Sequence, residues 1–362
     1  MSKLVFDVET DGIQYTKIWC IVVQDVETKE ISSFGPNELH EAVELLNTAD
    51  TLIGHNILTF DLPCIRKVLD LPCFGRDKEI LDTLVLSRLF VPDRKPGHKL
   101  SDWGSSLSYP KIDFHDYSHY SMQMLKYCVR DVELNTKVFK ELQWEAEGFS
   151  RQCIDLEHKV AEILGIQEKQ GFLLDIEKAA TIQEGLEKNL VTTKKIIKEV
   201  FKPKIIKTKI FPKYKKDGSI ARNAVTEHGK GTRLSEAESV DMAWTTDDHI
   251  IRTEVKELLI SSRPQLIEYL KDAGWEPKKF TDKGNVILNE KILETVTDIP
   301  EAAHIKNYFL LEKRLVQLNS WITSADPSTL RVHCHVIHNG TVTGRMTHRK
   351  PNMAQVPSVS VA

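Results

Sequence analysis

Residues 4–12, LVFDVETDG, decide the fold. A short apolar run that ends on a turn-forming Asp-Gly pair is typical of a buried β-strand. Side chains alternate between the two faces of a strand, so Asp7 and Glu9 should point the same way. Two adjacent carboxylates at the end of a buried strand repel each other unless a cation lies between them, and a hard divalent ion such as Mg²⁺ takes oxygen ligands. The alternative is an exposed strand end with two solvated acids, so the pair needs partners elsewhere in the chain.

The bulk composition predicts a globular protein of two or three domains, since the chain has 362 residues, of which 41% are apolar and 28% charged. No apolar run approaches the roughly 20 residues that span a bilayer, so we expect no membrane association. The first residues lead directly into the strand, so we expect no signal or transit peptide. The six cysteines form no C-x-x-C pair and should be core residues of a reducing compartment.

The net charge of −3 is unevenly distributed. Residues 1–150 hold 16 Lys/Arg against 24 Asp/Glu, a balance of −8, and the remainder holds 33 against 28, a balance of +5. An acidic first part suits a metal-binding site, and a basic second part suits a polyanion.

Strands and helices alternate over the first 150 residues. After the opening strand, the pattern predicts an antiparallel meander, then helices and buried strands, a long loop or several short turns, and a final helix. This order favours an α/β sheet of ribonuclease H-like type. The predicted strands are 17–24, 29–34 and 50–56, the predicted helices are 38–46, 62–69 and 123–147, a strand runs into a helix over 79–90, and the loop is 92–122.

The rest of the chain is predicted to be mostly helical, with helices over 151–200, 254–273 and 303–319. Residues 194–222 contain 11 Lys/Arg and only two acids. Because hydrophobic periodicity is weak from 202 to 240, we expect a basic, flexible or insert-like segment there. Residues 331–362 are predicted to form strands and loops.

Two later segments carry acids that can join Asp7 and Glu9. In residues 54–61 (GHNILTFD) a predicted strand ends and a helix begins, and Asp61 either caps that helix or faces a site. In residues 127–131 (YCVRD) the Tyr and the Asp are four apart on a predicted helix and lie on one face. Taken alone, this second pair is what an ordinary helix surface carries.

Together these segments form an ordered set: D-x-E on the first strand, N-x₃-F-D at the start of a helix and Y-x₃-D on a late helix. The set resembles the three motifs of the DEDD superfamily of 3′→5′ exonucleases, in the subgroup whose third motif carries Tyr. The resemblance implies that Asp7, Glu9 and Asp131 hold one Mg²⁺, that Asp7 and Asp61 reach a second, and that Tyr127 orients the attacking water. Mn²⁺ can substitute at such oxygen sites.

Most of the chain also resembles family A DNA polymerases, and within them the phage replicative type that recruits thioredoxin. The resemblance implies a proofreading exonuclease domain over 1–150, a helical thumb-like region over 151–330 and the start of the palm over 331–362. Candidate DNA contacts are Asn56, Phe60, Arg345 and Gln355. The matching stretches are 80–90, 98–107, 157–175, 261–284 and 343–357.

The likeness ends before the stretches that carry the palm's metal-binding aspartates and the fingers, so we expect no nucleotide incorporation from this chain alone. A truncated chain and a split polymerase, completed by a separate polypeptide with palm and fingers, are the alternatives. The expected partner is DNA. The basic segment is expected to be a solvated loop facing DNA, and the alternative is that it binds thioredoxin. The expected location is the cytoplasm of a phage-infected bacterium. An RNA-trimming exonuclease and a non-catalytic DNA-holding subunit are the competing functions.

Overall fold

The computed structural model describes residues 2–217, 219–236, 238 and 249–356. The chain divides into two compact units, one of Met1–Asp175 with Trp321–Ala362 and the other of Ile176–Ser320. The sequence suggested boundaries after 150 and 330 instead. The first boundary lies later than predicted because helix α6 (Arg151–Gln170) packs against β5 and α3 and so belongs to the first unit. The expectations for 239–240 and 357–362 lie outside the described residues.

The first unit is built on a five-stranded sheet with the order β3-β2-β1-β4-β5. Strand β1 (Lys3–Thr10) pairs antiparallel with β2 (Ile18–Asp25), which pairs antiparallel with β3 (Ile31–Phe34). On its other side β1 pairs in parallel with β4 (Thr51–Gly54), and β4 in parallel with β5 (Glu79–Asp82). The predicted meander and the predicted α/β class are therefore confirmed.

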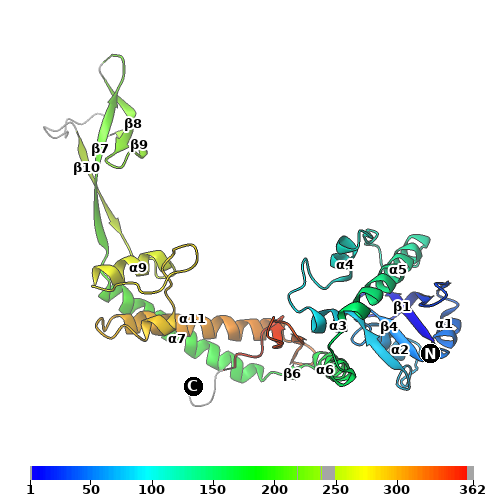
Figure 1. Cartoon of the computed structure of the whole chain (residues 1–362). Helices are drawn as coiled ribbons and strands as arrows, with labels where there is room; N and C mark the ends of the chain where they lie inside the picture. The colour runs from blue at the N-terminus through cyan, green and yellow to red at the C-terminus, as the bar shows by residue number, and fades with distance from the viewer. Residues whose placement is uncertain (1, 218, 237, 239–248, 357–362) are drawn as a thin grey trace. The chain divides into compact units, whose positions relative to one another are not determined.

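Helices cover both faces of this sheet (Figure 1). Phe6 of β1 packs in one core with α1 (Leu39–Asn47) and α2 (Asp61–Val68). Val5, its neighbour on the strand, packs in a second core with α5 (Met122–Glu145). A strand buried on both faces carries consecutive apolar residues, which explains the uninterrupted start of the opening sequence.

The chain between β5 and α5 contains two short helices. As predicted, β5 runs directly into a helix, α3 (Thr83–Phe90). The stretch 92–122 was predicted to be a loop or short turns, and it contains α4 (Leu100–Ser106). Trp103 is buried in a core with Leu134 of α5, so tertiary packing stabilises a helix whose polar composition gave little local signal.

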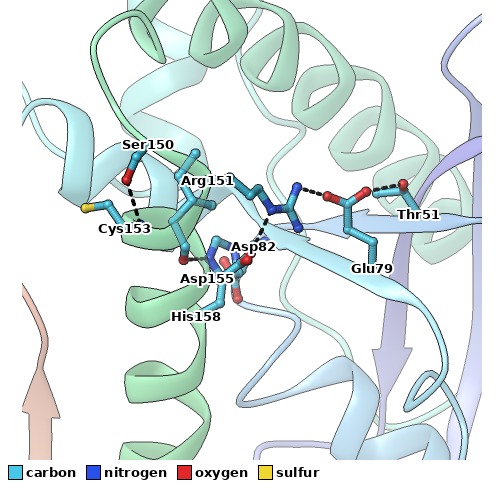
Figure 2. Close-up of polar contacts among 9 residues, drawn as sticks. Thr51, Glu79, Asp82, Ser150, Arg151, Cys153, Asp155 and His158 are labelled. Atoms are coloured by element: carbon cyan, nitrogen blue, oxygen red, sulfur yellow. Dashed lines mark hydrogen bonds and ion pairs between the residues drawn. The ribbon is translucent and has the colours of Figure 1, made fainter.

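Polar contacts attach α6 to the edge of the sheet (Figure 2). The N–H of Asp82 donates to Nε2 of His158 at 2.9 Å, with both residues buried. Arg151 forms ion pairs with Glu79 on β5 and with Asp155 one turn along its own helix. Glu79 also accepts a hydrogen bond from the hydroxyl of Thr51 at 2.7 Å. The start of α6 is thus fixed to the two parallel strands β4 and β5.

The C-terminal segment of the first unit adds two small antiparallel pairs, so the strands predicted for 331–362 are present. One pair joins β11 (Arg331–Val332) to β6 (Phe172–Leu173), and the other joins β12 (His335–Ile337) to β13 (Thr347–Arg349). Nδ1 of His335 lies 2.7 Å from a carboxylate oxygen of Glu168 on α6.

The second unit has a helical core, as predicted for this part of the chain. It is formed by α7 (Ile176–Val200), α9 (Arg263–Asp272), the short α10 (Glu290–Leu293) and α11 (Ala302–Ser324), whose last residues belong to the first unit. The predicted helix 254–273 begins only at Arg263, because a strand precedes it. Central residues of this core are Ile197, Leu266, Leu270, Ile305, Tyr308 and Phe309.

The basic segment between α7 and α9 forms a four-stranded antiparallel sheet of order β10-β7-β8-β9, a narrow ribbon in Figure 1. Its strands are β7 (Lys204–Tyr214), β8 (Ile220–Thr226), β9 (Gly231–Arg233) and β10 (Ile250–Lys256). The expectation of an unpatterned segment over 202–240 is therefore corrected where residues are described. The alternation of Lys with β-branched residues in β7 was the overlooked strand signal.

Candidate active site

Asp7 and Glu9 lie on the last half of β1 and continue the row of Val5, which faces α5. Strand alternation places them on that face, as predicted. Glu9 is only 7% exposed, so this is a buried strand end and not the exposed one of the alternative interpretation. A buried carboxylate needs a cation or hydrogen-bond donors, because desolvation is costly.

Asp61 also contacts β1, although it lies after the turn that follows β4. It is the first residue of α2, is 3% exposed, and its Oδ1 accepts a hydrogen bond from the N–H of Val8 at 3.0 Å. The N-cap residue of α2 is Phe60, so the helix-cap interpretation of Asp61 is wrong. Its carboxylate lies at the backbone between Asp7 and Glu9.

Asp131 and Tyr127 lie one turn apart on α5, as predicted from their spacing. Asp131 is 4% exposed and forms an ion pair with Lys111, whose Nζ also donates to the Tyr127 hydroxyl at 2.8 Å. The ring of Phe114 stacks on Tyr127 with centroids 5.5 Å apart. The Tyr127 hydroxyl is therefore held beside the Asp131 carboxylate.

The four acids have raised pKa values, and in three of them the charge of a neighbouring acid contributes to the rise. Burial, followed by the charge of Asp131, raises the pKa of Asp7 to about 7. Burial and the charges of Asp7, Cys20 and Asp131 raise the pKa of Glu9 to about 10. Burial and the charge of Asp7 raise the pKa of Asp61 well above its usual range. Burial also raises the pKa of Asp131, although Lys111 opposes this. Like charges crowded in a low dielectric favour protonation.

Cys128 adds a sulfur atom to the cluster. Its Sγ lies 3.6 Å from both the carbonyl oxygen and Oδ2 of Asp7. Asp7, Glu9 and Cys128 each offer a ligand atom within 4.8 Å of the others. Among the described residues, neither Asp61 nor Asp131 belongs to this group, and Oδ2 of Asp131 is paired with Lys111.

The donor set fits a divalent cation. Carboxylate oxygens dominate it, and these are the ligands of Mg²⁺ and Mn²⁺. Oδ1 of Asp131 is buried and has no hydrogen-bond partner among the described residues, so it keeps its capacity to bind a cation. The pKa values of these acids are raised without a metal ion, and binding of a dication would lower them and return the acids to their ionised form.

The four candidate DNA contacts lie in two segments, the turn after β4 and the C-terminal segment. Asn56 has a left-handed backbone (φ 73°), and its side-chain oxygen accepts a hydrogen bond from Thr59. Phe60 packs edge-on against Tyr15. Arg345 and Gln355 are exposed in the C-terminal segment. The sequence analysis missed Lys111, which lies in a segment without pattern, and Cys128, whose place between Tyr127 and Asp131 in the motif could have revealed it.

Comparisons with known proteins relate the chain to DNA polymerases. Residues 233–361 match the family model "DNA polymerase family A". The DNA-directed DNA polymerases of Escherichia phage T7 and Enterobacteria phage T3 are 27% and 28% identical to the chain, over 98% of its length. The DNA polymerase of Mycobacterium phage D29 is 26% identical over 45% of this chain and 29% of its own. The chain is therefore similar to DNA polymerases, and its residues 233–361 are similar to those of family A. More particularly, it is similar to those of the T7 and T3 type.

A solved structure shares the fold. The POL domain of Pol1 from M. smegmatis, in complex with DNA primer-template and dNTP, matches with a TM-score of 0.62 and 12% identity, over 98% of this chain and 52% of that one. The chain spans 63% of the length of the T7 and T3 polymerases. The family-model match does not include β1, so an assignment of the acidic cluster depends on its geometry. Within the described residues, no helix is long and apolar enough to cross a membrane.

Proposed function

We propose that this chain carries a divalent-metal-dependent 3′→5′ exonuclease that removes terminal nucleotides from DNA, as the proofreading activity of a family A replicative polymerase. The observation that supports it most is the placement of Asp7 and Glu9 at the end of β1, with the Asp61 carboxylate bonded to the N–H of Val8 on the same strand and with Asp131 on α5, the helix that packs on their face. In a ribonuclease H-like domain, such a cluster serves phosphodiester hydrolysis.

Asp7, Glu9 and Asp131 would hold one Mg²⁺, with Asp7 and Asp61 reaching a second, and Mn²⁺ could take their place. When bound, the ions supply Lewis-acid chemistry that favours ionisation of water and stabilises charge on the phosphate and the leaving oxygen. Tyr127 holds its hydroxyl at the edge of the cluster, where it can orient a water molecule. Burial of the acids excludes bulk water and strengthens their electrostatic interactions.

DNA is the proposed substrate and partner because the homologues are DNA polymerases and the solved neighbour holds a DNA primer-template. The basic β7–β10 sheet is a further candidate surface for phosphates. It is inserted between α7 and α9 of the thumb-like unit, where the resemblance to thioredoxin-using polymerases also makes thioredoxin a candidate partner.

Substitution of the acids tests the proposal directly. We expect Asp7→Asn and Asp131→Asn to lower the rate of 3′-terminal nucleotide release from single-stranded DNA by about a thousandfold, which corresponds to roughly 4 kcal/mol of transition-state stabilisation. Tyr127→Phe should slow release only about tenfold, because the carboxylates remain. The measurement is release from a 5′-labelled oligonucleotide with Mg²⁺ and with EDTA.

Glu44→Gln is the matched control, because it neutralises an exposed acid of α1 in the same unit. It should retain the wild-type rate. Wild-type rates in Asp7→Asn would show that the site is wrongly assigned. A clear preference for RNA over DNA of equal length would exclude the proofreading role.

A further inference from the structure

Lys111 places a positive charge inside the acidic cluster. It lies in the segment between α4 and α5, and its side chain is 23% exposed. Its Nζ contacts Oδ2 of Asp131, donates to the Tyr127 hydroxyl at 2.8 Å and lies 4.7 Å from the centroid of the Tyr127 ring. Three contacts to two neighbouring side chains fix the ammonium in one position.

The charge of Lys111 acts on three of the four acids and not on Asp131 alone. It opposes the rise in pKa of Asp7, of Glu9 and of Asp131. A cation at this point stabilises the ionised acids when no metal is bound. It also repels an incoming dication and takes one of the two oxygens of Asp131.

We propose that Lys111 is the counter-ion of the metal-free cluster and competes with the divalent cation for Asp131. This inference depends on the proposed function, because it concerns the same carboxylates. Oδ1 of Asp131 stays open to a metal ion, but the ion must bind beside an ammonium that holds Oδ2, so the site binds metal more weakly than its acids alone would allow. Lys111 acts as a positioning residue through Asp131 and Tyr127.

Calorimetric titration of the full chain with Mn²⁺ alone tests the competition without any reaction. At one fixed pH, Lys111→Met should bind Mn²⁺ about tenfold more tightly than wild type, a difference of about 1.4 kcal/mol. Lys111→Gln, which keeps a hydrogen-bond donor for Tyr127 and Asp131 without the charge, should behave in the same way and serves if the Met variant does not fold.

Lys140→Met is the matched control for the loss of one positive charge from this unit. Lys140 is exposed on α5, the helix of Asp131, but lies nine residues further on, about 13 Å along the helix axis. It should leave the Mn²⁺ affinity within twofold of wild type. An equal gain in Lys140→Met would mean that net charge, and not competition at Asp131, controls binding, and would overturn the inference.

Thermal unfolding gives a second readout. In EDTA, Lys111→Gln should melt below wild type, because the acids have lost their counter-ion. Saturating Mn²⁺ should raise its melting temperature by more than it raises that of wild type. One outcome would overturn the role of Lys111 but not the proposed function. In it, wild type and both Lys111 variants show equal Mn²⁺ affinity and equal melting shifts, while Asp7→Asn loses Mn²⁺ binding. No saturable Mn²⁺ binding in any of the proteins would overturn this inference and the proposed function together.

Discussion

Asp7 and Glu9 keep their protons in the folded, metal-free protein far above the pH at which free carboxyl groups lose them. Burial is the first cause for both, and the neighbouring acids are the second. The pKa of Asp7 rises from 3.8 to about 7 and that of Glu9 from 4.5 to about 10. Between the unfolded and folded values the native state holds more protons than the unfolded state, so raising the pH through this window removes stability.

This sign gives a prediction for the metal-free protein. In EDTA, the melting temperature should fall as the pH rises from about 5 to about 8, through the folded pKa of Asp7, and the fall should be smaller in Asp7→Asn. Scanning calorimetry at the two pH values measures it. Glu44→Gln should show the full wild-type fall. A fall of the same size in Asp7→Asn would mean that other groups cause the pH dependence.

At the scale of an element, the start of α3 depends on one buried carboxylate. Asp82 accepts hydrogen bonds from the N–H groups of Leu84 and Asn56 at 2.9 Å and of Leu58 at 3.2 Å. It therefore caps α3 and also fixes the turn after β4 that leads to Asp61. Burial raises the pKa of Asp82, so the hydrogen bonds compensate only part of its desolvation.

Asp82→Ala should lower the free energy of unfolding by about 3 kcal/mol or more, because several buried N–H groups lose their acceptor. Ser121→Ala is the comparison, since Ser121 caps α5 with a single bond to Met124 N–H at 3.1 Å, and its loss should cost only about 1 kcal/mol. Urea unfolding of both variants checks the difference. Equal losses would show that Asp82 is an ordinary cap.

Elements with a strong local pattern were predictable, and those that depend on tertiary contacts were not. β1 and α5 carry clear periodicity, so the sequence predicted which faces hold Asp7 and Asp131. α4 was missed because Trp103 becomes a core residue only when α5 lies against it. The ion pair between Lys111 and Asp131 could not be predicted either, since Lys111 lies in a segment without periodicity and meets α5 only in the folded protein.

At the scale of the molecule, charge separates the acidic first part from the basic β7–β10 sheet. Lys207 and Lys209 of β7 are exposed and point to the same face of that sheet, two residues apart. Each phosphate contact releases counter-ions from a single strand, which makes binding fall with salt. DNA affinity of the full chain should therefore depend on this sheet.

A double variant with Lys207→Ala and Lys209→Ala should bind single-stranded DNA more weakly than wild type, and the slope of log K against log salt should be less steep by about 1.4. Fluorescence anisotropy at several salt concentrations measures both quantities. The control changes Lys140 and Lys159, two exposed lysines of the first unit, to Ala. If the control loses as much affinity as the double variant, the sheet is not the DNA surface.

The alternation of β1 also determines which genetic changes this protein can survive. Phe6 belongs to the core under α1 and α2, whereas Asp7 and Glu9 face α5. An insertion or deletion of a single codon within this strand would turn both carboxylates into an apolar interior and bring Phe6 to the face that now holds the acids. A change of length by one residue exchanges the two faces, so it would disrupt the core and the acidic cluster at once.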